Sequence, residues 1–308
     1  MPDLLWEPSR CVLAWRMPRA CLLVALMFAL SAIGCGDVNE AISRTVESRR
    51  VASDLHVQFS RAAEASNRAV MADNDDASVA AVKDAEDAVR LVESNAASLR
   101  TTLQGLNYTD ELRMLDEFDE RFAAYRQADA QILTLAVQNT NIKAQQLSFG
   151  AAQTAADAFE AALHGVSAAG AGSERWHVDA LTATAIAAVR QIQVLQAPHI
   201  ADPDETAMNR MEQRMTAAEA QARASLKSLG LLVPAASRAR VARASSALDQ
   251  FVSVNANITS LSRQNTNVRS LALSLEQKRT LVKPCEDSLV ALQSALAKRG
   301  YLSTRQPT

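Results

Sequence analysis

The residues that could do chemistry in this chain are few and scattered. Its four histidines are His56, His164, His177 and His199. His164 and His177 flank one predicted loop and could meet, but two imidazoles alone make a poor zinc site. Di-iron bundles use two Glu-x-x-His pairs, and this chain has a single one, Glu174 and His177. "GAGS" at 170–173 follows a predicted helix instead of the strand that precedes a phosphate loop. With no pairing of a nucleophile and a base, we expect a protein that is not an enzyme and has no metal or cofactor.

Arginines are the side chains best suited to a ligand site, because a guanidinium group can bind a carboxylate through two hydrogen bonds. Five candidates lie beside predicted apolar rows: Arg49, Arg61, Arg68, Arg190 and Arg214. A small organic acid could bind between helices at one or more of them. The alternative is that each arginine lays its stem along the apolar row and keeps its charge in water.

A polar tetrapeptide, "QNTN", occurs at 138–141 and again at 264–267, inside two long apolar-periodic stretches. Asn139 and Asn265 fall at core-type positions, where a buried asparagine fixes the register of neighbouring helices. We therefore expect a polar layer formed by Gln138, Asn139, Asn141, Gln264, Asn265 and Asn267. A ligand or water site made by the same side chains, or their exposure to solvent, are the alternatives.

Composition favours helices. Of the 308 residues, 48% are hydrophobic and only 4% aromatic, and there are just 9 glycines and 8 prolines. Abundant Ala, Leu, Arg, Glu and Gln are good helix formers, so the chain is expected to be all-α. The net charge is −2 and the charges are interspersed along the chain, which argues against nucleic acid as a partner.

The N-terminal part has the layout of an export signal. Within 17–34, Arg19 precedes an apolar run and small residues, followed by Cys35. "AIGC" at 32–35 resembles the lipobox of bacterial lipoproteins, with Ala32 in place of the usual leucine. We expect a signal peptide over 17–34 and lipid attachment at Cys35; an uncleaved anchor and simple cleaved export are the alternatives. A lipid anchor implies tethering to a membrane of the bacterial cell envelope, with the protein facing the periplasm.

The remaining ends and the last cysteine carry less information. Residues 1–16 read as an overextended start or a long n-region, and 301–308 as a tail. Cys285 is the one cysteine left after Cys35, so no disulfide within the mature chain is expected. Its place on an apolar row predicts a buried structural thiol.

Six helices are expected in the domain at 35–300. They cover 38–73, 75–104, 109–164, 174–199, 203–230 and 235–298. A shift of about 126 residues maps the first three onto the last three, which defines a repeat of about 38–164 and 174–298. The apolar rows of the two long helices end at Phe149 and Leu275 and agree at this shift, including three-residue steps at Tyr125–Ala128 and Phe251–Val254. A shared irregularity argues for internal duplication.

Short loops join antiparallel neighbours, so each long helix must serve two cores. The expected architecture is two stacked antiparallel four-helix bundles, with both continuous long helices running through both bundles. The two "QNTN" copies should then cross where the bundles meet.

This helix order resembles the helical bimodular sensor domains of bacterial chemoreceptors and sensor kinases, relatives of the four-helix-bundle sensor domain. The resemblance covers about 38–298 and rests on helix order and length, without a specific motif. It implies that a small organic acid binds between the helices of one module, often through arginines, and that the protein forms a homodimer.

Two functions are therefore carried forward. The first is a membrane-tethered, periplasm-facing, sensor-like binding module for a small anionic metabolite. Because the sequence shows no signalling region after the last helix, we expect such a module to act through a partner such as a membrane receptor, or as a lipid-tethered binding protein. The alternative is a lipid-anchored structural or adaptor bundle that pairs with another envelope protein.

Overall fold

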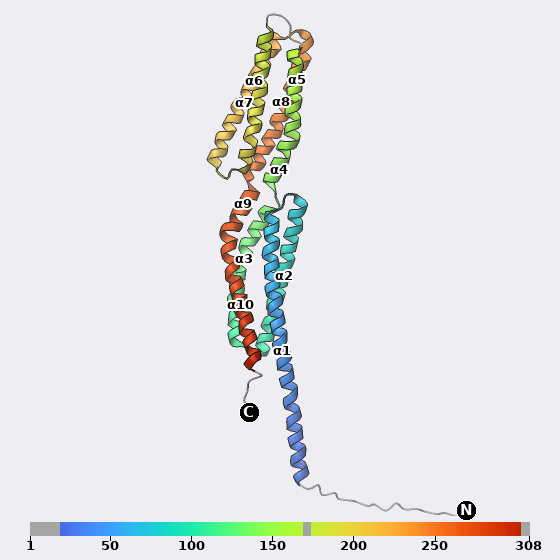
Figure 1. Cartoon of the computed structure of the whole chain (residues 1–308), viewed down its shortest axis with the longest axis vertical. Coiled ribbons are helices and arrows are strands. Elements are labelled where there is room, and N and C mark those ends of the chain that lie inside the picture. Colours follow the sequence, from blue (N-terminus) through green and yellow to red (C-terminus); the bar gives the residue numbers. More distant parts are fainter. Residues whose placement is uncertain (1–18, 169–173, 303–308) are drawn as a thin grey trace, which may run out of the picture.

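The structure, a computed structural model, describes the backbone of residues 19–168 and 174–302 and the side chains of 39–168 and 174–299. Four predicted features lie outside the described side chains: the start segment 1–16, the signal peptide 17–34, Cys35 and the tail 301–308. Every secondary-structure element in the described part is helical (Figure 1), which confirms the predicted all-α fold.

The four shorter predicted helices are continuous. They are α1 (Arg19–Val70), α2 (Asp75–Gly105), α6 (Arg175–Ala201) and α7 (Glu205–Leu232). The two long predicted helices are each divided into four segments. The first comprises α3 (Thr109–Ala136), α4 (Thr140–Leu147), the π-helix η1 (Ser148–Ala152) and α5 (Gln153–Ala168). The second comprises α8 (Ala235–Gln264), α9 (Thr266–Leu273), the π-helix η2 (Ser274–Lys278) and α10 (Arg279–Leu302).

At the ends of two loops, a side chain caps the N-terminus of the helix that follows. Asn74 precedes α2 and accepts a hydrogen bond from the backbone N–H of Ala77 at 2.8 Å. Asp204 precedes α7 and accepts one from Thr206 at 2.8 Å. Such caps satisfy backbone donors that the first helical turn leaves free.

The prediction of continuous long helices was wrong at two equivalent points. Asn139 has φ 50° and Asn265 has φ 54°, both in the left-handed region. Asparagine is one of the few residues besides glycine that adopts this conformation routinely. Asn139 is the N-cap residue of α4, and Asn265 is both the C-cap residue of α8 and the N-cap residue of α9. At each point the chain turns slightly and continues in the same general direction (Figure 1).

The first group of helices consists of α1, α2, α3 and α10, which pack on one another. Its core contains an aromatic cluster in which Phe59 contacts Phe118, Phe122 and Tyr125 edge-on, with ring centroids 5.2–6.1 Å apart. These four rings lie at or near full burial. Edge-on aromatic pairs stabilise a core beyond the apolar area that they bury.

The second group consists of α5, α6, α7 and α8 and has a more aliphatic core. It follows the first group along the long axis in Figure 1, at the end away from the described termini. Within the described residues, α6 alone is long and apolar enough to cross a membrane. Residues such as Val178, Val189 and Ile192 are buried against the neighbouring helices, which explains this composition by core packing.

Two details of the predicted apolar rows were wrong. Phe149 and Leu275, which are 126 residues apart, are 72% and 58% exposed. Both lie in π-helices, whose wider turns interrupt the side-chain period of an α-helix. At the first three-residue step the inward position is taken by Asp129, with Ala128 only half-buried beside it. The core row of α3 therefore contains a carboxylate.

Candidate functional site

The two "QNTN" copies meet at the junction between the helix groups, as predicted. The backbone N–H of Thr140 donates to Thr266 Oγ1 at 3.2 Å, and that of Thr266 donates to Thr140 Oγ1 at 3.1 Å. Asn141 and Asn267 exchange the same kind of bond, each N–H donating to the other residue's Oδ1 at 3.1 Å. Each copy thus caps the first turn of the helix that starts at the other copy.

The amides of this junction are also paired. Asn141 Nδ2 donates to Asn265 Oδ1 at 2.7 Å, and Asn267 Nδ2 donates to Asn139 Oδ1 at 3.0 Å. Asn139 in turn donates to Asp75 Oδ1 at 3.0 Å and so ties the junction to the start of α2. This bond is the largest of the effects that lower the pKa of Asp75. Buried amides with partners of this kind specify one geometry.

Four of the six residues predicted for the polar layer, the asparagines, are brought together. Gln138 and Gln264 are exposed, and no side-chain contact of theirs with the junction is seen within the described residues. The prediction missed Thr140 and Thr266, which are buried at the centre of the motif. Their position inside a repeated polar segment was the available signal, because a threonine hydroxyl can accept from a helix N-terminus.

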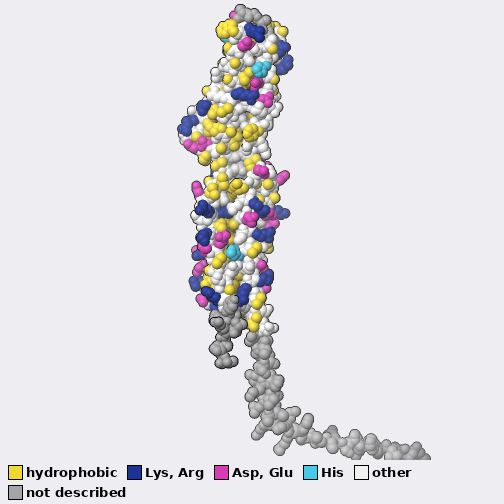
Figure 2. All heavy atoms as spheres, in the orientation of Figure 1, with side chains coloured by type: hydrophobic (Ala, Val, Ile, Leu, Met, Phe, Trp, Pro, Cys, Tyr) yellow, Lys and Arg dark blue, Asp and Glu magenta, His cyan; other side chains and the backbone are white. Residues whose placement is uncertain are grey.

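The five predicted arginines are dispersed. Three have partners on other helices: Arg49 donates to the carbonyl oxygens of Leu296 and Ala297, Arg68 pairs with Asp84, and Arg190 pairs with Asp157 and Glu160. Arg61 and Arg214 are exposed on α1 and α7. None of the five lines the cavities described below. Acidic and basic side chains alternate over the face shown in Figure 2.

The first group of helices is called the first bundle below, and the second group is called the second bundle. A buried charged cluster lies inside the first bundle and was not predicted from the sequence. Asp129 on α3 accepts a hydrogen bond from Ser66 Oγ at 2.5 Å, and its carboxylate lies 3.5 Å from the ammonium group of Lys278 at the end of η2. Lys278 also donates to the carbonyl oxygen of Ala63 at 3.2 Å and to Asn67 Oδ1 at 2.9 Å. Both charged side chains are 3% exposed. The cluster links α3 and η2 to α1.

Burial moves both members of the pair toward their neutral forms. Loss of hydration raises the pKa of Asp129, while its bonds to Ser66 and Lys278 oppose that rise. The same loss lowers the pKa of Lys278, opposed by the charge of Asp129. The neighbouring Tyr125 hydroxyl is buried without a hydrogen-bond partner in the described part of the chain. Burying two charges and an unpaired hydroxyl in one core lowers the stability of the folded state. Such groups are often kept for function, so this region is a candidate functional site.

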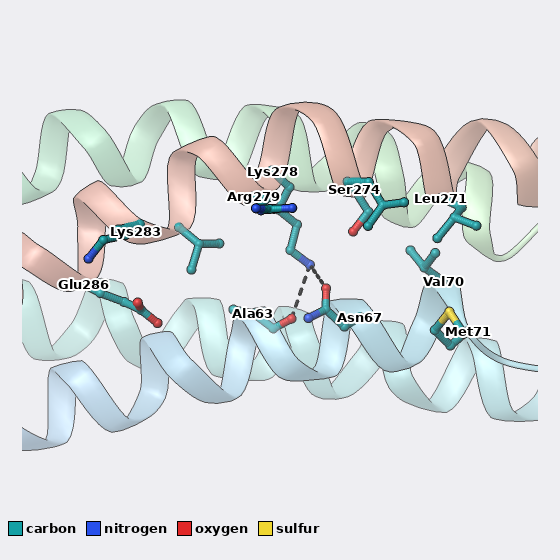
Figure 3. Close-up of a pocket in the computed structure, with 12 residues that line it drawn as sticks. Ala63, Asn67, Val70, Met71, Leu271, Ser274, Lys278, Arg279, Lys283 and Glu286 are labelled. Carbon is teal, nitrogen blue, oxygen red and sulfur yellow. Dashed lines mark hydrogen bonds between the residues drawn. The ribbon is translucent and has the colours of Figure 1, made fainter.

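A cavity of about 340 Å³ opens along the seam between α1 and the η2–α10 segment, beside this cluster. Figure 3 shows Lys278 reaching across the seam toward Asn67 and Ala63. Its lining contains three cationic side chains, Lys278, Arg279 and Lys283, against one acidic side chain, Glu286. The apolar part of the lining is Ala63, Val70, Met71, Leu271, Leu275 and Val282. Its volume falls in the range of about 300–1,000 Å³ that small-molecule sites occupy.

The corresponding place in the second bundle is built differently. At the 126-residue offset, Asn255 stands for Asp129 and Ala152 for Lys278. Asn255 accepts from Gln196 Nε2 at 2.9 Å, and Gln196 accepts from Ser148 Oγ at 2.7 Å. The second bundle therefore has a neutral amide network where the first has an ion pair. The cavity that Asn255 lines has a volume of about 190 Å³, against about 790 Å³ for the cavity that Asp129 lines between α2 and α3.

The histidines do not form a common site. His199 is fully buried and contacts Ser262 Oγ at 2.8 Å and Glu212 at 2.9 Å. His164 lies near Glu160 and His177 near Glu174, in the same helix or at its start. Among the residues described, no group of three or more His, Cys, Asp or Glu side chains is placed to hold a metal.

Cys285 is fully buried in the first core. Burial raises the pKa of its thiol to about 12. A thiol in that state is a poor nucleophile, in agreement with the structural role predicted for it.

Comparison of the chain with protein-family models and with curated proteins gives no match in either case.

Proposed function

We propose that this protein is a membrane-tethered, periplasm-facing binding module that takes a small anionic metabolite in its first bundle. The observation that carries the proposal is the cavity between α1 and η2–α10, with cationic side chains outnumbering its one carboxylate. A concave site with a few charged groups and apolar walls is the usual form of a small-molecule site.

Arg279 is the cation most available to a ligand. Lys278 is held by Asp129, Ala63 and Asn67, and Lys283 pairs with Asp287 at 3.0 Å. The Arg279 side chain is exposed, and within the described residues it has no ion pair or hydrogen bond. An unpaired guanidinium at the rim of a cavity suits a carboxylate.

The resemblance to bimodular sensor domains supports the same function, since those domains bind organic acids between helices. It also supports action through a partner, either a second copy or a membrane receptor. Tethering through Cys35 would hold the first bundle near the membrane, because that residue lies in the N-terminal part of α1 (Figure 1).

The test is a thermal-shift screen of the full chain in detergent against organic acids, neutral analogues and amines. A ligand at 100 times its dissociation constant adds about 2.7 kcal/mol to the free energy of unfolding, so a clear rise in Tm is expected with one class of acid. Arg279→Gln should remove the rise. If no acid shifts Tm, the proposal fails.

A matched variant separates this site from the arginines predicted from sequence. Arg68→Gln removes an exposed guanidinium from α1 that does not line the cavity. It should leave the ligand-induced rise in Tm unchanged. If Arg68→Gln loses the ligand-induced rise in Tm and Arg279→Gln keeps it, the ligand binds at the arginine predicted from the sequence and not in the cavity.

The adaptor function is favoured by one separate observation. Trp176, in the first turn of α6, is 69% exposed, and Leu231, in the last turn of α7, is 80% exposed. Both helix ends lie at the pole opposite the described chain ends (Figure 1). If the screen is flat, crosslinking from this pole is the experiment that tests a protein partner.

A further inference from the structure

The cavity in the first bundle is divided by the side chain of Lys278. In Figure 3, Val70, Met71 and Leu271 lie on one side of Lys278, and Lys283 and Glu286 lie on the other. The first side forms an apolar compartment close to the junction. Its polar side chains are Ser274, which belongs to η2, and Asn67, which accepts a hydrogen bond from Lys278.

Three of the apolar side chains around this compartment are exposed to solvent. Met71 is 72% exposed, Leu275 is 58% exposed and Leu271 is 39% exposed. They come from two segments far apart in sequence and line one cavity. Large apolar side chains gathered at the mouth of a cavity expose a surface that an apolar ligand would cover.

Two polar groups that are free to bind a ligand line the same cavity. Neither the Arg279 guanidinium nor the Ser274 hydroxyl has a side-chain partner in the part of the chain that is described. Lys278, in contrast, has its ammonium group committed to Asp129, Ala63 and Asn67. One guanidinium and one hydroxyl match a single carboxylate.

We infer that the ligand is an amphipathic monocarboxylate, an acid with one carboxylate and an unbranched or branched apolar chain. The carboxylate binds Arg279 and Ser274, and the chain covers Met71, Leu271 and Leu275. The inference rests on the proposed function and names the ligand class for the same cavity.

The far side of the cavity disfavours a second carboxylate. Glu286 lies there and has no ion-pair partner within the described residues. A dicarboxylate would place its second charge either against the apolar side chains or toward Glu286, where the nearby cation, Lys283, is already paired with Asp287 at 3.0 Å. Both arrangements are unfavourable, so the site should discriminate by repulsion as well as by attraction.

The first experiment compares acids of increasing chain length by isothermal titration of the full chain in detergent. Butanoate, hexanoate and octanoate differ by two methylenes per step, and each buried methylene should strengthen binding about fourfold. Affinity should therefore rise about sixteenfold per step until the compartment is filled. Adipate, which has the length of hexanoate and a second carboxylate, and hexylamine, which has the opposite charge, should bind at least tenfold more weakly than hexanoate.

Two variants test the position of the apolar chain. Leu275→Gln should remove most of the dependence on chain length. Phe149→Gln is the matched control, because Phe149 is the residue 126 positions earlier, is exposed in η1 and does not line the cavity. Its affinity for hexanoate should equal that of the unmodified chain. Partition of the acid into detergent would affect both variants alike.

The outcomes separate the inference from the proposed function. If adipate binds and hexanoate does not, the ligand class is wrong and anion binding stands. If no acid binds, both fail. If hexanoate and hexylamine bind with equal affinity and Arg279→Gln changes neither affinity, the cavity binds apolar chains regardless of their charge. The inference is then overturned.

Discussion

At the level of the π-helices, the first bundle buries Lys278 against Asp129, whereas the second has Ala152 and an amide network around Asn255 at the same offset. The backbone is alike in both, since a left-handed asparagine and a π segment recur 126 residues apart. The two halves share these backbone features and differ in their interior chemistry. Charge and a larger cavity now belong to one bundle.

The difference follows from what each backbone irregularity has to satisfy. At the asparagine breaks, each copy caps the other, so both copies need the same residues. At the π segments, each bundle packs on its own neighbours, so the residues can differ. This explains why the two copies have the same residues at the junction and different residues at the π segments.

The largest expected effect comes from removing one member of the ion pair. Asp129→Asn places at this position the residue that the second bundle has, but leaves Lys278 buried without its counter-charge. We expect a loss of about 3 kcal/mol in the free energy of unfolding, because an uncompensated buried charge is strongly destabilising. Urea denaturation of the full chain measures it.

The double variant Asp129→Asn with Lys278→Ala completes the exchange and is the matched control. Both charges are then gone, and stability should return to within about 1–2 kcal/mol of the unmodified chain. If the double variant is less stable than Asp129→Asn alone, the residues of the second bundle cannot replace the ion pair in the first. The two positions would then not be structurally equivalent.

The next effect concerns the junction that the bundles share. Thr266→Val keeps the side-chain shape but removes the hydroxyl that accepts from Thr140 N–H. Loss of one buried cap should cost about 1–2 kcal/mol. Thr140→Val should cost the same by symmetry, and the double variant less than the sum, because both hydroxyls belong to one network.

Thr134→Val is the control for these substitutions. Its hydroxyl is exposed and donates to the carbonyl oxygen of Ala130 one turn earlier in the same helix, at 2.7 Å. Its removal should change stability by less than about 0.5 kcal/mol. Unequal costs for Thr140→Val and Thr266→Val would show that the junction is not symmetric.

The sequence predicted the features that depend on local pattern. Apolar periodicity located all six helical regions, and the exact repeat of "QNTN" placed the two copies at one junction. The left-handed breaks were missed because the apolar row continues in phase across Asn139 and Asn265. Their geometry depends on caps from a distant segment, which no local pattern contains.

The ion pair was missed for a similar reason. A charged residue next to an apolar row is usually exposed, so Ala128 was assigned to the core and Asp129 was not. Asp129 is buried because Ser66 and Lys278, from α1 and η2, compensate its charge. Neither partner is near it in sequence. Arg279 is likewise identified only by its place at a cavity formed by separate segments.

The Asp129–Lys278 pair should make the free energy of unfolding depend on pH, by an amount on the order of 1 kcal/mol. Asp129 has a raised pKa, so just above its ordinary value of 3.8 the folded state holds a proton that the unfolded state has lost. Stability therefore falls as pH rises through that window. Lys278 has a lowered pKa, so just below 10.5 the unfolded state holds the extra proton, and stability rises with pH there.

The measurement is the difference in the free energy of unfolding between the unmodified chain and the Asp129→Asn, Lys278→Ala double variant, from pH 4 to pH 10. The contributions of the other titrating groups are the same in both proteins, so they cancel in this difference. It should have a minimum near neutral pH. A flat difference would mean that the pair titrates alike in the folded and unfolded states, and that burial has no net effect on it.

The smallest expected effect tests whether the bundles differ on their surfaces as well. Arg100 pairs with Asp116 at 2.6 Å and Asp119 at 2.7 Å in the first bundle, and Arg190 pairs with Asp157 and Glu160 in the second. Both arginines are partly exposed, where ion pairs contribute about 0–1 kcal/mol. Arg100→Gln and Arg190→Gln should therefore each cost about 0.5 kcal/mol in urea denaturation, and less at high salt. A cost above about 2 kcal/mol for either one would place part of the difference between the bundles outside their cores, since only a desolvated pair reaches that value.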